Sequence, residues 1–200
     1  MTRADVSIPR APVGGDSRVS IHTPSTAVWP LLFGAAGGSL GGAIGLGVLA
    51  VAASLDGRQP WAAPNAVGAW FVRWLQSAAP PAMDSFYWDA SLGGILLAAG
   101  VGALAGAVFA GVVEGLPDDH PVAWGLITGA AAWAATRWLV APALDPALIE
   151  AFDSRALLAA HLAAGLFIGL WVLEGRTLAR RLPPAAPAAM PAGDHETTAA

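Results

Sequence analysis

One histidine, His161, lies well inside a long apolar run of the sequence, where polar side chains are rare. An imidazole can hydrogen-bond a neighbouring helix, and it can also take up a proton near neutral pH. A polar ring in hydrocarbon loses free energy unless it has a partner, so His161 should face other protein groups rather than lipid. In a bundle of antiparallel helices, Thr136 and Trp133 lie at a similar depth, and Ser91 enters another helix from the same side. We predict a hydrogen bond between His161 and one of these groups, with Thr136 as the first candidate.

This intramembrane polar site, defined as His161, Thr136 and Ser91, has two interpretations. A neutral histidine that ties two helices together would serve the structure, and interhelical bonds of this type are common. A histidine that titrates would instead suit a small transporter or a proton-responsive channel. Such proteins line their path with several polar groups, whereas the interior of the first apolar run has only Ser39. This scarcity favours a protein with a structural or accessory role.

The acidic residues and the other histidines indicate no metal site and no cofactor. Glu114 and Glu174 each end an apolar run, where headgroup water can solvate a carboxylate. The stretch 118–120 holds two aspartates and a histidine, but a cluster without further ligands at set spacing is typical of a solvated turn. His22 and His195 lie near the ends of the chain, so a bis-histidine haem would need a second chain.

Missing residue types exclude several classes of enzyme. The chain has no cysteine and no lysine, which removes thiolate nucleophiles, P-loop lysines and Schiff bases. No serine–histidine–acid set can be placed, so we do not expect an enzyme. The G-x-G-x-x-A patterns at 45–50 and 100–105 lie within apolar runs rather than between a strand and a helix, so they do not indicate a dinucleotide site. A net charge of −4 gives no electrostatic basis for binding nucleic acid.

The composition indicates a membrane protein. Hydrophobic residues make up 56% of the chain and charged residues 12%, against roughly 25% charged residues in soluble domains. Four runs are long enough to cross a bilayer, which takes about 20 apolar residues, and only helices satisfy their own backbone there. The predicted spans are 27–54, 88–114, 121–141 and 155–174. They form one transmembrane domain, 27–182, between disordered tails at 1–26 and 183–200, the second rich in proline and alanine.

The connection between the first two spans has a helical periodicity of its own. Its apolar positions from Val67 to Ala78 fall on one face, which fits a short amphipathic helix in the membrane interface. A loop helix packed on the bundle fits the same periodicity.

A weak internal duplication indicates two repeats of two spans each. The segment 70–75 resembles 133–139 with one insertion, 81–86 resembles 146–152, and a Val-x-Glu-Gly sequence ends the second and fourth spans. Two spans per repeat give both repeats one orientation, so they are parallel rather than inverted. The predicted fold is an all-α membrane protein: four transmembrane helices as two parallel two-helix repeats, with a short interfacial helix in the first loop.

Glycines spaced by four residues follow one face of several spans. Small residues at this spacing let helix backbones approach closely in lipid, where no hydrophobic effect drives association. We expect a tightly packed bundle, or a homo-oligomer through the face of the first span. The glycines assigned to helix packing are Gly34, Gly38, Gly42, Gly102, Gly106, Gly165 and Gly169.

The distribution of arginines mildly favours both termini in the cytoplasm. With four spans, six arginines near the termini share one side of the membrane, and Arg58, Arg73, Arg137 and Arg155 lie on the other. The expected partners are the lipid bilayer and either a second copy of the chain or a protein of a membrane complex. We expect no nucleic acid.

The second half of the chain resembles a known family in several short motifs. These are Val-Val-Glu-Gly-Leu-Pro at 112–117, Trp-Gly-Leu-Ile-Thr-Gly-Ala at 124–130, Pro-Ala-Leu-Asp-Pro at 142–146, His161 and Glu-Gly-Arg at 174–176. The part from 88 to 182 is similar to the YagU-like inner-membrane proteins of the DUF1440 type, a bacterial family without an assigned biochemical activity. The resemblance implies a small polytopic protein of the bacterial cytoplasmic membrane, and a link of some members to acid tolerance.

The chain departs from this family at one position. Members often have an intramembrane histidine in the preceding repeat as well, where this chain has Ser-Leu-Gly-Gly at 91–94. Of the family positions, His161, Glu114 and Glu174 carry over, without known roles.

Overall fold

The described part of the chain is helical. A computed structural model describes residues 28–69, 72, 83–116, 120–144 and 151–181, and within these ranges it contains helices and no strand. The predicted tails and most of the predicted interfacial helix lie outside the described residues. The elements are α1 (Val28–Leu55), α2 (Ala62–Gly68), α4 (Trp88–Val113), α5 (Pro121–Ala135), η4 (Thr136–Val140), α6 (Ala141–Leu144) and α8 (Ser154–Arg181).

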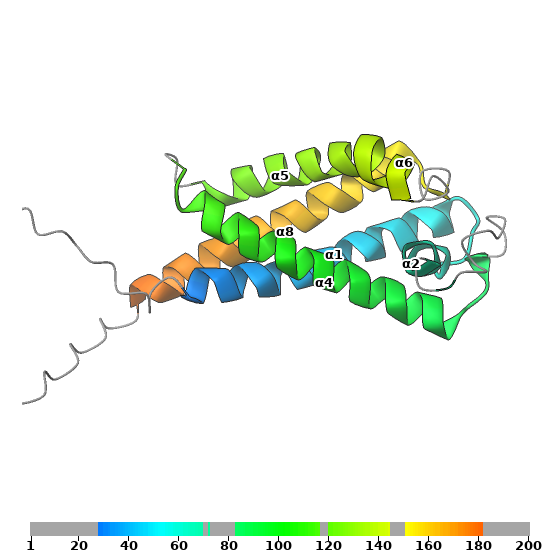
Figure 1. The fold of residues 1–200 in the computed structure, drawn as a ribbon, viewed down its shortest axis with the longest axis horizontal. Helices are drawn as coiled ribbons and strands as arrows, with labels where there is room; N and C mark the ends of the chain where they lie inside the picture. The colour runs from blue at the N-terminus through cyan, green and yellow to red at the C-terminus, as the bar shows by residue number, and fades with distance from the viewer. Residues whose placement is uncertain (1–27, 70–71, 73–82, 117–119, 145–150, 182–200) are drawn as a thin grey trace, which may run out of the picture.

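The long helices lie side by side in the order α4, α1, α8, α5 (Figure 1). Helix α1 packs along α4 on one side and along α8 on the other, and α5 packs along α8. Each neighbouring pair is antiparallel. In the first pair, for example, Gly34 faces Gly106 while Gly42 faces Ala98. The outer helices α4 and α5 make few contacts with each other.

Three of the helices are long and apolar enough to cross a membrane: α1, α4 and α8. Many of their large apolar side chains point away from the bundle, and Leu104 on α4 is 69% exposed. Water would penalise such a surface, whereas the hydrocarbon of a bilayer would solvate it. The all-helical, membrane-compatible architecture expected from the composition is therefore confirmed.

The predicted third span is not one continuous α-helix. Its α-helical part ends at Ala135, and a π turn, η4, follows before α6 completes the stretch to Leu144. The backbone N–H of Ala141 donates to the carbonyl of Thr136, five residues earlier, as a π turn requires. Pro142 gives a physical reason, because it has no N–H to donate and its ring crowds the carbonyl four residues before it.

Two further boundaries differ from the sequence prediction. Helix α8 continues to Arg181, well past Glu174, because a helix needs no apolar side chains once it leaves the bilayer, and Arg180 and Arg181 in its last turn interact favourably with the helix dipole. The helix described in the first connection, α2, begins at Ala62, upstream of the predicted segment, and is buried against α4. Its glycine at position 68 has no room for a side chain beside the carbonyl of Ala90.

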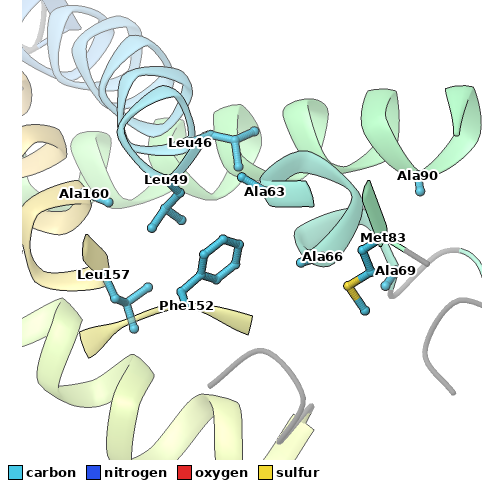
Figure 2. Packing of buried hydrophobic residues seen from close by; sticks show 10 residues of the cluster. All are labelled: Leu46, Leu49, Ala63, Ala66, Ala69, Met83, Ala90, Phe152, Leu157 and Ala160. Atoms are coloured by element: carbon cyan, nitrogen blue, oxygen red, sulfur yellow. The ribbon is translucent and has the colours of Figure 1, made fainter. Parts of the chain in front are cut away.

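The largest buried apolar cluster lies at the end of the bundle where α1 ends and α8 begins (Figure 2). The ring of Phe152 points toward Leu49 of α1, and Leu157 of α8 lies beside it. Phe86, which the internal duplication matches to Phe152, is 50% exposed and packs on Trp61, with ring centroids 4.7 Å apart. The matched phenylalanines thus have different surroundings.

Arg58 joins three segments at this same end of the molecule. Its Nε donates to Asp84 Oδ1 at 3.2 Å, and its Nη1 donates to the carbonyl of Ala151 at 2.8 Å. The connection after α1 is therefore tied to the segment before α4 and to the segment before α8.

Candidate functional site

His161 lies on the face of α8 that packs against α5. The two backbones meet closely here, because a Cβ atom on Gly129 of α5 would overlap the carbonyl oxygen of His161. The imidazole is half-buried and directed toward the end of α5, where Thr136 begins the π turn. The sequence-predicted partner Thr136 thus lies within reach of the histidine.

Two hydrogen bonds define the state of the His161 ring. Its Nδ1 lies 2.8 Å from the carbonyl oxygen of Leu157, which can only accept, so Nδ1 carries the hydrogen. Its Nε2 lies 3.1 Å from Thr136 Oγ1. In a neutral ring Nε2 then has a lone pair, and the threonine hydroxyl donates to it. Both nitrogens are satisfied by the protein in the neutral state.

The π turn positions the threonine. The N–H of Thr136 bonds to the carbonyls of Ala132 and Trp133, while its own carbonyl accepts from Ala141. A π turn adds one residue to a helical turn and is frequently found at functional sites. The extra residue rotates the following side chains, so the sequence spacing alone could not give the direction of the threonine hydroxyl.

Ser91 and Trp133 have other surroundings. Ser91 is buried, and its hydroxyl donates to Asn65 Oδ1 at 2.8 Å, so the structure does not bring it to His161. Trp133 stacks edge-on with Trp138, with ring centroids 5.3 Å apart, and its buried indole N–H has no hydrogen-bond partner among the described residues. Of the three residues of the predicted polar site, the structure joins His161 and Thr136.

Asn65 of α2 forms a second polar cluster that the sequence analysis missed. It is fully buried, and its Nδ2 donates to the carbonyls of Met83 at 2.8 Å and Ser85 at 2.6 Å. With the bond from Ser91, the amide joins α2, the segment before α4 and α4 itself. The signal in the sequence was a single amide within an otherwise apolar stretch, Ala62–Gly68.

A cavity of about 290 Å³ lies between α4 and α5 and has α1 and α8 as its floor. Its wall is almost entirely apolar, and the polar side chains that the described residues contribute to it are Thr128, Thr136 and His161. Val101, Ala105, Thr128 and Ala132 line it and are also exposed, so they mark its mouth on the outside of the bundle. The His161–Thr136 pair therefore lies in the wall of a cavity that opens sideways.

Glycines let the backbones of the helices that form the floor and the walls of the cavity approach one another closely. Added Cβ atoms would overlap carbonyl oxygens across both helix pairs, Gly38 with Gly102 in the first pair and Gly125 with Gly165 in the second. The glycines on the other face of α1 are used as well, since they meet Trp171, Ala164 and Ala160 of α8. Both glycine faces of α1 are thus occupied within one chain. The glycines concerned are Gly34, Gly38 and Gly42 toward α4, Gly37, Gly41 and Gly45 toward α8, Gly102 and Gly106 on α4, and Gly165 and Gly169 on α8.

The predicted boundary acids lie on the surface. Glu114 caps α4 and is exposed, and Glu174 is exposed on α8, one turn before Thr177. Near them, Arg176 Nη2 donates to the carbonyl of Val113 at 3.2 Å and so joins the ends of α4 and α8. Within the described ranges, acidic residues and histidines do not form a group of three that could hold a metal ion.

Comparison with known proteins adds no relative. No protein-family model, no curated protein and no solved structure matches the chain significantly. The resemblance to YagU-like proteins therefore stays a prediction from short motifs.

Proposed function

We propose that the chain is a four-span protein of the bacterial cytoplasmic membrane with a structural or accessory role, similar to the YagU-like family. The observation that carries this proposal is the composition of the interior of the bundle. Glycine backbones form the contacts between helices, and the described spans bury no charged side chain. Transport paths and active sites usually need several polar or ionisable groups. A helix bundle whose interior is used for packing is better suited to hold or support other membrane components.

The helical stretch from Pro121 to Leu144 is the proposed fourth span. At ~1.5 Å per residue it is about 36 Å long, enough for a hydrocarbon core of about 30 Å. It packs along α8, which is itself long and apolar enough to span, and Ile127 on its outer face is 55% exposed. A helix that lies lengthwise against a spanning helix shares its depth, so we assign this stretch to the bilayer despite its π turn.

Four spans put both termini on one side, and the arginine bias favours the cytoplasm. Cysteine can be introduced singly because the chain has none. We expect Ser85→Cys, which leaves the Arg58–Asp84 bridge intact, to react with a membrane-impermeant maleimide in whole cells, and Arg3→Cys to react only after lysis. The reverse pattern would overturn the orientation, and labelling of both from outside would show that α1 does not cross the membrane.

The accessory role is tested by isolating the full chain in a gentle detergent and weighing the particle by native mass spectrometry. We expect a second protein at a fixed ratio. A lone monomer or dimer from cells that express the chain at its natural level would count against the accessory role and favour the second candidate.

That second candidate is a proton-responsive site at His161, and the position of the histidine in the cavity wall beside a π turn favours it. Under the structural role, His161→Gln should melt like the parent and behave identically between pH 5 and pH 8, because glutamine keeps a donor and an acceptor without titrating. His161→Leu and Thr136→Val should lose about 0.6–1.7 kcal/mol, the range of interhelical bonds in membranes. A His161→Gln variant that melts normally but loses growth at acid pH would support proton sensing instead.

A further inference from the structure

We infer that the cavity between α4 and α5 binds one acyl chain of a membrane phospholipid, which enters sideways through the mouth between these helices. This assigns a ligand to the cavity and goes beyond the accessory role proposed above.

The cavity has the length of one leaflet. Along α1 its lining runs from Gly38 to Leu49, about 16 Å at ~1.5 Å per residue, which is close to half of a hydrocarbon core of about 30 Å. It begins about 9 Å from the ends of the helices at Leu55 and Ser154 and runs toward the centre of the bundle. Its other end, at Gly38, lies about 15 Å from Val28, so the cavity crosses the middle of α1 and extends further toward the side of Arg58 and Asp84.

Its width fits a single hydrocarbon chain. A volume of about 290 Å³ over this length gives a mean cross-section of about 18 Å², close to that of one hydrocarbon chain at a carbon contact distance of ~4 Å.

The chemistry of the wall favours hydrocarbon over water or a polar ligand. His161 and Thr136 already bond to each other, and the other nitrogen of the histidine is held by Leu157. Thr128 is the remaining polar side chain of the lining, and a threonine hydroxyl in a helix can bond to its own backbone. A buried water needs two to four polar partners, which this wall does not offer. Hydrocarbon needs none, and it is the solvent outside the mouth.

The mouth also has the small side chains that a chain would need to pass. Ala105 of α4 and Ala132 of α5 line the cavity from the two helices that flank its mouth, and both are exposed. Ala131, the neighbour of Ala132 on the same helix, is equally exposed but does not line the cavity. These two adjacent alanines make a matched pair for a test.

The test uses the full chain in nanodiscs that contain phosphatidylcholine with a photoreactive diazirine in the middle of one acyl chain. After illumination, we expect mass spectrometry with residue-level assignment to find the lipid on Leu46 and Leu49 of α1 and on Ile168 of α8, which line the cavity and are otherwise buried. Ala132→Trp should reduce this labelling roughly tenfold, equivalent to about 1.4 kcal/mol, while Ala131→Trp should leave it unchanged.

Ala105→Phe, on the opposite wall, should reduce the labelling in the same way, so the test does not depend on the folding of one variant. Equal labelling of Leu46, Leu49 and Ile168 in the Ala132→Trp and Ala131→Trp variants would overturn the inference. So would labelling confined to the exposed side chains of the helices in the parent protein. Neither result depends on whether a protein partner is found, so the accessory role and the lipid site can fail separately.

Discussion

Replacing Gly102 with leucine should separate α1 from α4 and leave little folded protein. A Cβ on Gly102 would overlap the carbonyl oxygen of Gly38, and a Cβ on Gly38 would overlap the carbonyl oxygen of Gly102. Backbone cannot rotate away as a side chain can, so the helices would have to move apart along their whole contact. Overpacking in a tight core costs about 1–3 kcal/mol, occasionally more, and we expect this contact to exceed that range because both partners are backbone.

The milder change Gly38→Ala gives a measurable version of the same experiment. We expect a loss of about 1–3 kcal/mol and, at 2–4 °C for each kcal/mol in a chain of this size, a fall in melting temperature of roughly 2–12 °C. Size-exclusion chromatography of a fluorescent fusion after heating in detergent measures it. Gly47→Ala and Gly100→Ala are the matched controls, because a Cβ at either position meets open space. Their melting temperatures should match the parent or rise slightly, since alanine is the better helix former.

If Gly38→Ala and Gly47→Ala melt together, the close approach of α1 and α4 is not what holds this bundle. A change in particle mass in Gly38→Ala, without a change in melting temperature, would instead mean that this face joins two chains.

The helical class and three long apolar helices could be predicted from the sequence, because long apolar runs without charge leave the backbone few alternatives in lipid. The pairing of His161 with Thr136 could also be predicted. In antiparallel helices, the depth of a residue follows from its distance along the helix from the predicted helix start, at ~1.5 Å per residue. The direction in which each side chain points could not be predicted. Rotation of α4 about its axis depends on what packs against it, and the buried helix α2 turns Ser91 toward Asn65 instead of toward His161.

The π turn shows how a local signal can be present in the sequence and still be misread. The segment 133–139 is one residue longer than its matched segment 70–75, and a π turn is how a helix accommodates one additional residue. The insertion falls between Trp133 and Arg137, in the stretch that contains Thr136. A pattern search at a period of 3.6 residues has no place for this extra residue, so it predicted one regular helix.

Asn65→Ala should be the most damaging single change outside the glycines. The amide is fully buried and makes three hydrogen bonds, to the carbonyls of Met83 and Ser85 and from the hydroxyl of Ser91. Alanine would leave those three groups without their partner; the Met83 carbonyl and the Ser91 hydroxyl are buried, whereas the Ser85 carbonyl is partly buried. An unsatisfied buried polar group costs about 1–3 kcal/mol, so the two buried groups should cost at least about 2 kcal/mol unless water enters.

The effect should be local to one end of the bundle before it becomes global. Hydrogen exchange should rise first in α2 and in the first turns of α4, because the amide joins these segments, while α5 and α8 keep their protection. Gln59→Ala removes an exposed amide from the same connection and should leave both exchange and melting temperature unchanged.

Ser91→Ala removes one of the three bonds and should cost about 1 kcal/mol, and the double variant with Asn65→Ala should cost less than the sum of the two. Strict additivity would mean that the Asn65–Ser91 bond contributes nothing, and an Asn65→Ala variant as stable as Gln59→Ala would show that α2 is not anchored through this amide.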